Sequence, residues 1–331
     1  MNTKFTSDRD CLYSRRQFIA GSATALAAAA CFPYSGKAAG DVAPAPNIAF
    51  PSAARDRIAI ASYPFRQFIT PGEPDEAAAS SAGQAPKMEL KDFAAHVVEK
   101  FKINKIEPWS VHFASQEPQY LENLRAAFDA AHVSVVNIAV DGEHSIFAAD
   151  AAERQRGIDE SKRWIDTAVA IGSPSVRTHL AAAKDSPPEG KRAAESLHQV
   201  AEYGAKKNVV VNLENDNPVT EDAFFVAKLV ATVHTPWLHA LPDFANSLPV
   251  MQTAQAYNAL DAMFSEAYNI CHVKALEVNE IGVKYSVNMG KAFGILKLRN
   301  FKGYCSMEFD SPGDPYSGTA DLIKQTLHHL S

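Results

Sequence analysis

The chain has 331 residues, which is enough for one large α/β barrel or for two smaller domains. Its 38 acidic residues outnumber its 32 basic ones, so its formal net charge is −6. Nucleic acid carries a dense negative charge and binds basic surfaces. Composition and charge therefore argue against a nucleic-acid partner.

Residues 1–40 have the features of an export signal. The paired Arg15 and Arg16 precede an Ala-rich apolar run at 19–32, and small residues follow at 36–40. The apolar run is too short to cross a bilayer, so we expect a twin-arginine signal peptide and no stable membrane span. The expected location is periplasmic or extracytoplasmic. Cleavage after residue 38 would remove five basic and two acidic residues and change the net charge from −6 to −9.

The rest of the chain begins with a short linker and continues as an alternation of strands and helices. Residues 41–56 are rich in Ala and Pro, which predicts a linker. Short β-branched apolar runs predict strands at 57–62, 104–109, 133–140, 175–180, 209–214, 238–243, 270–275 and 303–308. Apolar residues at helical spacing predict helices at 89–101, 118–131, 152–171, 190–206, 220–232, 249–268, 287–298 and 319–330.

Eight strand–helix units with no break in composition predict a closed (β/α)8 TIM barrel, a single α/β domain over residues 57–331. An open, doubly wound sheet is the alternative fold. No Gly-x-Gly-x-x-Gly turn follows the first strand, which argues against its dinucleotide-binding form. The stretch 63–87, rich in Pro, Gly, Ala and Ser, predicts a long loop over one end of the barrel. Cys271 and Cys305 fall in predicted strands, which favours buried thiols over a disulfide.

Four polar side chains occur at or near the ends of the last four strands. Glu214, Asp243, His272 and Glu308 are separated by 29, 29 and 36 residues, about one strand–helix unit each. In a barrel the ends of these strands meet at one face. Three carboxylates gathered there would repel one another unless a cation lay between them. Two Glu, one Asp and one His suit Mn²⁺ or Mg²⁺ and tolerate Co²⁺ or Zn²⁺. Salt bridges at the barrel rim are the alternative role.

From about residue 57 to its end, the chain resembles the xylose-isomerase-like barrel superfamily of sugar and sugar-phosphate isomerases and epimerases. The residues that carry the resemblance are Glu214-Asn215, Asp243 with Asn246 nearby, His272-Val-Lys274 and the late Glu308. The resemblance implies that Glu214, Asp243, His272 and Glu308 hold one divalent metal ion, and that the two Glu also act as acid and base. Many relatives have His where this chain has Asn246. A DNA-repair endonuclease branch needs such histidines for several zinc ions, so their absence argues against that branch.

Such a site suits the removal of a proton next to a carbonyl. The ion stabilises the enediolate that forms, one carboxylate takes the proton, and the other returns it. Return to the other face of the same carbon is epimerisation, return to the adjacent carbon is isomerisation, and loss of a β-substituent is elimination. We therefore expect a sugar isomerase or epimerase. The alternatives are a lyase or hydratase acting on 3-keto-glycosides and a sugar-binding barrel without catalysis.

Six further residues near strand ends are predicted to contact substrate. Trp rings stack on sugars, and cationic, amide or imidazole groups bind hydroxyl or keto oxygens. The six are Glu107, Trp109, Arg177, His179, Asn246 and Lys274. Packing or a rim salt bridge is the alternative role for each. The expected partner is a small-molecule carbohydrate; an exported enzyme would meet free sugars or oxidised glycosides more often than phosphorylated ones. The sequence is also compatible with a homo-oligomer.

Overall fold

The computed structural model describes residues 45–72, 88–216 and 219–331. The predicted signal peptide, residues 41–44 of the predicted linker and residues 73–87 of the predicted long loop lie outside this part of the chain. Strand β2 (Ile69–Thr70), which lies within the predicted loop 63–87, pairs in parallel with β3 (Met88–Glu89).

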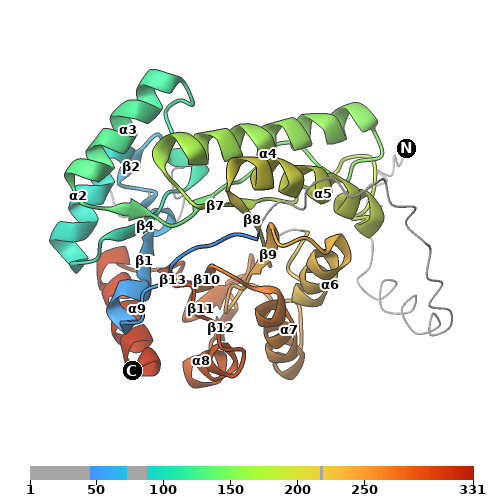
Figure 1. The fold of residues 1–331 in the computed structure, drawn as a ribbon. Coiled ribbons are helices and arrows are strands. Elements are labelled where there is room, and N and C mark those ends of the chain that lie inside the picture. Colours follow the sequence, from blue (N-terminus) through green and yellow to red (C-terminus); the bar gives the residue numbers. More distant parts are fainter. Residues whose placement is uncertain (1–44, 73–87, 217–218) are drawn as a thin grey trace, which may run out of the picture. The chain divides into compact units, whose positions relative to one another are not determined.

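The described residues form a closed barrel of parallel strands surrounded by helices (Figure 1). Pairing runs in the order β10-β13-β1-β4-β5 in one sheet and β6-β7-β8-β9 in the other. The sheets join where residues 136–137 interrupt the third predicted strand, and again where Asp243 pairs with His272. The strands are β1 (Ile58–Ala61), β4 (Lys105–Glu107), β5 (Ser134–Val135), β6 (Ile138–Ala139), β7 (Ser175–Thr178), β8 (Val210–Glu214), β9 (Leu238–Leu241), β10 (Ile270–Val273) and β13 (Tyr304–Met307).

A helix follows each of the eight predicted barrel strands, the third of which is divided into β5 and β6, and this confirms the predicted TIM-barrel class. The helices are α2 (Leu90–Phe101), α3 (Pro118–Ala130), α4 (Ala151–Ile171), α5 (Gly190–Lys207), α6 (Ala223–Val233), α7 (Thr253–Glu266), α8 (Met289–Leu298) and α9 (Pro315–Leu330).

Capping residues and proline explain three of the differences from the predicted boundaries. Helix α9 begins four residues early because the Asp314 side chain accepts hydrogen bonds from the first backbone N–H groups. Asp222 caps α6 in the same way, so that helix begins three residues late. Strand β9 ends at Leu241 because Pro242 has no N–H to continue the ladder.

An antiparallel hairpin between β10 and α8 has no counterpart in the sequence prediction. It consists of β11 (Leu276–Val278) and β12 (Lys284–Ser286). None of its strand residues is fully buried. The barrel strands were predicted from short runs of apolar residues that are buried on both faces. The hairpin has no such run, so it was not predicted.

Two apolar clusters stabilise the barrel. The larger one fills the space between strands and helices, and it includes Cys271 and Cys305, whose Sγ atoms lie 3.8 Å apart as free, buried thiols, as predicted. The smaller one comprises Ala59, Val136, Leu241, Ile270 and Tyr304 and includes the first residues of β10 and β13.

Part of the predicted linker packs against the smaller cluster. Phe50 makes edge-to-face contacts with Tyr304 and with Tyr268, at centroid distances of 5.9 and 5.4 Å. The Tyr268 hydroxyl donates to the Pro46 carbonyl and accepts from the Ile48 N–H, each at 3.0 Å. Residues 46–50 are therefore held against the end of the barrel opposite the predicted site.

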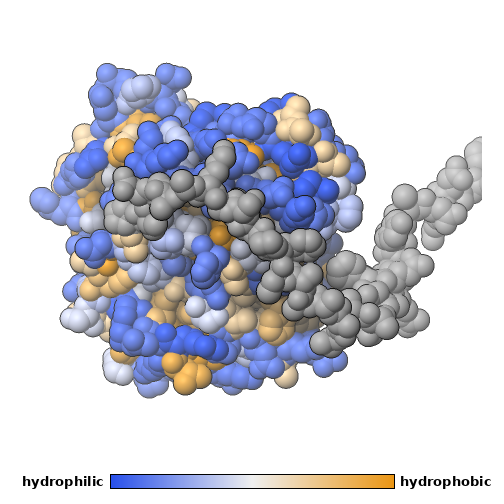
Figure 2. Space-filling model, turned by 45° about the vertical axis from the view of Figure 1, so that its right-hand side comes forward, coloured by the Kyte–Doolittle hydropathy of each residue, from blue (hydrophilic) through white to orange (hydrophobic). Residues whose placement is uncertain are grey.

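The surface drawn in Figure 2 is largely hydrophilic, with hydrophobic residues dispersed among the polar ones. Across the described ranges, the large apolar side chains that are exposed include Ile281 and Leu298. Single exposed apolar residues are ordinary on soluble surfaces. None of the described helices is both long and apolar enough to cross a lipid bilayer.

We predict that Phe50→Ala lowers the free energy of unfolding by about 2 kcal/mol, less than for a fully buried Phe because the residue is half-buried. Phe224→Ala, at a position 43% exposed on α6, is the control and should change it by less than about 0.5 kcal/mol. Urea titration followed by circular dichroism measures both. Equal effects of the two substitutions would show that the contacts of Phe50 with the barrel contribute no stability.

Candidate metal centre and active site

The four predicted ligands meet at the C-terminal face of the barrel. One possible ligand atom from each of Glu214, Asp243, His272 and Glu308 lies within 4.8 Å of those from the other three. All four residues are buried. Strand direction explains the meeting, because the residues stand at or just beyond the ends of neighbouring parallel strands.

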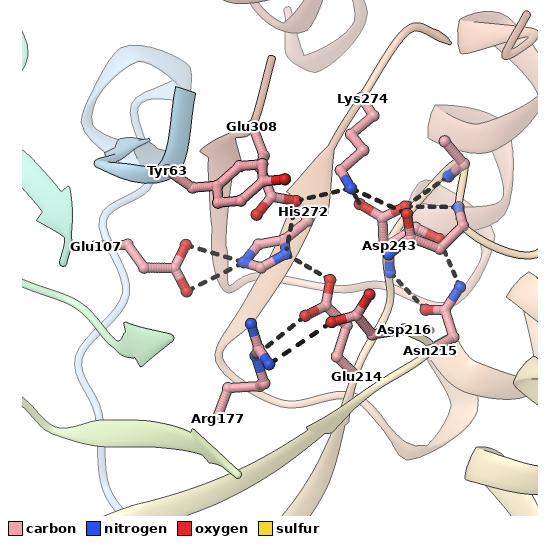
Figure 3. Close-up of polar contacts among 12 residues, drawn as sticks. Tyr63, Glu107, Arg177, Glu214, Asn215, Asp216, Asp243, His272, Lys274 and Glu308 are labelled. Atoms are coloured by element: carbon pink, nitrogen blue, oxygen red, sulfur yellow. Dashed lines mark hydrogen bonds and ion pairs between the residues drawn. The ribbon is translucent and has the colours of Figure 1, made fainter. Parts of the chain in front are cut away.

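His272 is the centre of the group and is held from two sides (Figure 3). Its Nδ1 lies 2.7 Å from Glu214 Oε1 and 3.2 Å from Glu308 Oε2. Its Nε2 lies 2.9 and 3.1 Å from the two carboxylate oxygens of Glu107. Burial alone would lower the pKa of His272, but these three carboxylates outweigh burial and raise it well above its ordinary value.

Asp243 keeps one buried oxygen without a hydrogen-bond partner. Its Oδ1 accepts from the N–H groups of Ala245 and Asn246, at 2.7 and 2.8 Å. Its Oδ2 has no such partner among the described residues, and Lys274 Nζ lies 3.9 Å away. Burial raises the pKa of Asp243 to about 8; Lys274 opposes the rise, and Glu214 and Glu308 add to it. The site thus contains three buried carboxylates, one of which has an oxygen without a hydrogen bond, and an imidazole. These groups fit a divalent cation.

Two buried cations hold the carboxylates of Glu214 and Glu308. Arg177 Nε lies 3.1 Å from Glu214 Oε2. Lys274 Nζ lies 3.2 Å from Glu308 Oε2. Burial raises the pKa of Glu214, and His272 and Arg177 offset only part of the rise. Burial acts in the same direction on Glu308, but His272 and Lys274 outweigh it and hold the pKa of that carboxyl well below its ordinary value.

A second group of possible ligands lies beside Arg177. Atoms of Asp141, His179 and Asp216 lie within 4.8 Å of one another. Arg177 Nη1 is 2.8 Å from Asp141 Oδ1 and 3.7 Å from Asp216 Oδ2. These two carboxylates therefore already have a cation between them.

The centre borders a cavity of about 290 Å³, at the lower end of the range for small-molecule sites. Two aromatic residues form part of its wall: Tyr63 and Trp109 meet edge to face at 5.0 Å, and the Trp109 indole N–H donates to Asp141 Oδ2 at 2.7 Å. Five of the six predicted substrate contacts line it, namely Trp109, Arg177, His179, Asn246 and Lys274.

Glu107 is the exception among the predicted substrate contacts. Its exposed fraction is 0%, it does not line the cavity, and His272 lies between its carboxylate and those of Glu214 and Glu308 (Figure 3).

Four carboxylates of the cavity were not predicted. Asp216 and Asp310 lie two residues beyond Glu214 and Glu308, so the alternation of side chains along a strand, continued past its end, would have indicated both. Asp141 directly follows a predicted strand and was a comparable signal. Glu277 comes from the unpredicted hairpin, and no sequence pattern indicated it.

Comparison with known proteins shows that this architecture recurs among sugar epimerases. An L-ribulose 3-epimerase structure superposes with a TM-score of 0.62 at 16% identity, over 82% of this chain and 95% of that chain. A 3-keto-D-glucoside 4-epimerase from E. coli gives 0.56 at 12% identity, over 81% and 98%. A xylose isomerase-like TIM barrel protein from Mycobacterium smegmatis, solved in complex with magnesium, gives 0.58 at 14% identity, over 83% and 97%.

At these identities the superpositions show the shared fold. No curated protein sequence matches the chain. Residues 95–330 match the sequence pattern of the family described as "Xylose isomerase-like TIM barrel", and the chain therefore belongs to that family.

Proposed function

We propose that this protein is a divalent-metal-dependent carbohydrate epimerase or isomerase. The observation that carries the proposal is the buried cluster of Glu214, Asp243, His272 and Glu308 beside a cavity of small-molecule size. Among the described residues, two oxygens of this cluster, Asp243 Oδ2 and Glu308 Oε2, have no hydrogen-bond donor. Structural similarity to sugar epimerases supports it. We also propose export by the twin-arginine route, on the basis of Arg15 and Arg16.

The four clustered residues would hold the ion, His272 through Nδ1, which faces Glu214 and Glu308. When bound, a divalent ion withdraws electron density from a substrate carbonyl and makes the adjacent proton easier to remove. Mn²⁺ and Mg²⁺ match the oxygen-rich set of ligands best, and Co²⁺ or Zn²⁺ is compatible with the histidine.

Glu214 and Glu308 are the proposed acid and base. Both line the cavity, and each is held by its own cation, Arg177 or Lys274. One carboxylate removes the proton from the carbon next to the carbonyl, and the other returns a proton. A lyase or hydratase acting on 3-keto-glycosides would begin with the same proton removal, and similarity to a 3-keto-D-glucoside 4-epimerase keeps this as the second candidate.

The charge of the cavity favours an uncharged carbohydrate. Among the described residues, its lining contains two cations, Arg177 and Lys274, which are buried and already paired with carboxylates. The same lining contains six carboxylates, those of Asp141, Glu214, Asp216, Glu277, Glu308 and Asp310. A phosphate or carboxylate on the substrate would be repelled by this excess of negative charge. Free sugars and 3-keto-glycosides carry no such group.

We predict that Asp243→Asn lowers the affinity for Mn²⁺ roughly 100-fold or more, because a charged ligand is lost. Chelation of the unaltered protein should abolish turnover, and added Mn²⁺ or Mg²⁺ should restore it. Isothermal titration calorimetry measures binding. Asp261→Asn, which removes a surface carboxylate paired with Arg299, is the control and should bind Mn²⁺ normally. Full turnover after chelation would contradict metal dependence.

We predict that Glu308→Gln and Glu214→Gln each reduce kcat by roughly 100- to 10,000-fold, because neither amide can accept the transferred proton. Substrate turnover in D₂O, followed by mass spectrometry, should show one deuterium incorporated per turnover by the unaltered enzyme when the removed proton exchanges with solvent. Undiminished turnover by either variant would remove that residue from the acid–base pair.

We predict that kcat/KM for phosphorylated sugars is at least about 100-fold lower than for their neutral counterparts, because opposed like charges cost several kcal/mol. A panel of free ketoses, 3-keto-glycosides and the corresponding sugar phosphates, assayed with Mn²⁺, measures this ratio. A preference for the phosphate esters would contradict the argument from cavity charge.

A further inference from the structure

We propose that Glu107 is a positioning residue, which orients His272 so that its Nδ1 faces the metal site. The proposal rests on the metal centre proposed above. It assigns to Glu107 a role other than contact with substrate.

The contact geometry supports this role. Both carboxylate oxygens of Glu107 reach His272 Nε2, at 2.9 and 3.1 Å, on the side of the ring away from Glu214 and Glu308. Both residues have an exposed fraction of 0%. Among the described residues, the imidazole of His272 is the one ion-pair partner of Glu107. A buried carboxylate is costly unless it is paired, so this carboxylate depends on the ring that it holds.

Uncharged groups inside the barrel hold the Glu107 carboxylate in place. Asn137 Nδ2 donates to Glu107 Oε1 at 2.7 Å. Asn137 Oδ1 in turn accepts from Ser175 Oγ at 2.6 Å and from Asn212 Nδ2 at 3.3 Å. Ser175 Oγ also accepts from Asn269 Nδ2 at 2.8 Å. All these residues are buried, so the network joins several strands in the barrel interior.

The chemistry of imidazole explains why this orientation matters. Histidine binds a metal through the lone pair of an unprotonated ring nitrogen, while the other nitrogen carries the proton. When Nε2 carries the proton, its N–H group donates a hydrogen bond to the Glu107 carboxylate. The lone pair of Nδ1 then points toward Glu214 and Glu308. Such outer partners of metal-binding histidines typically contribute 10- to 100-fold in metal affinity.

The alternative is that Glu107 only fills the polar interior of the barrel. In that case its substitution would destabilise the protein and would affect metal binding no more than a change elsewhere in the network. Asn269→Ala is the matched control, because Asn269 is buried in the same network, where it donates to Ser175 and makes no hydrogen bond to His272.

The experiment measures Mn²⁺ binding to the full chain by isothermal titration calorimetry. We expect Glu107→Gln to raise the Kd about 10- to 100-fold, and Asn269→Ala to leave it within about twofold. As a second readout, ¹⁵N NMR of histidine-labelled, Mg²⁺-loaded protein should show the proton fixed on Nε2 of His272 in the unaltered protein, and a mixture of ring states in Glu107→Gln. Should Glu107→Gln fail to fold, Glu107→Asp shortens the reach to Nε2 and keeps the charge; it should also weaken binding.

The outcomes separate the two proposals. Equal Mn²⁺ affinity in the unaltered protein and in the folded Glu107 variant overturns the positioning role and leaves the proposed function standing. An equal loss in Glu107→Gln and Asn269→Ala also overturns it, since both would then act through the barrel as a whole. No binding of Mn²⁺ or Mg²⁺ by the unaltered protein overturns the proposed function and this inference together.

Discussion

The electrostatics of one buried imidazole dominate the structure. Glu107, Glu214 and Glu308 lie within 3.2 Å of the ring of His272 where almost no surface is exposed. Burying carboxylates is costly, so each needs a cation or donor. Ion pairs with Arg177 and Lys274 stabilise Glu214 and Glu308, and His272 lies beside all three glutamates. In the part of the chain that the structure describes, however, Asp243 Oδ2 has no hydrogen-bond donor. A divalent cation at this point would complete the balance of charge, which is why the metal proposal follows from the arrangement itself.

The inside of the barrel changes in character from one end to the other. A small apolar cluster includes the first residues of β10 and β13, and Phe50 from outside the barrel packs against it. Uncharged polar side chains such as Asn137 and Ser175 occupy the next level, and the charged cluster lies at the C-terminal ends of the strands. TIM-barrel interiors are usually filled by branched aliphatic residues. Here the polar level connects the packed core with the site, so Glu107 is held by hydrogen bonds in the barrel interior.

The residues that line the cavity indicate which substrates the site would accept. Its cations are buried and hold Glu214 and Glu308, so neither is available for an anionic group without breaking an existing ion pair. Tyr63 and Trp109 present aromatic surface on another part of the wall, which is suited to the C–H faces of a sugar. The small size of the cavity, its aromatic wall and its excess of negative charge together favour a neutral carbohydrate over a sugar phosphate.

The sequence by itself determined the barrel and the four clustered residues. Apolar periodicity is a local property, and it located the strands and helices to within a few residues; Glu214, Asp243, His272 and Glu308 recur at strand ends, which a parallel barrel brings to one face. Only the tertiary structure decided which side chains contact the four clustered residues. Glu107 and His272 are 165 residues apart and come from strands that are not adjacent in the sheet. Their contact depends on how the strands are staggered as the barrel closes, and that stagger arises from the packing of the whole chain rather than from any local pattern.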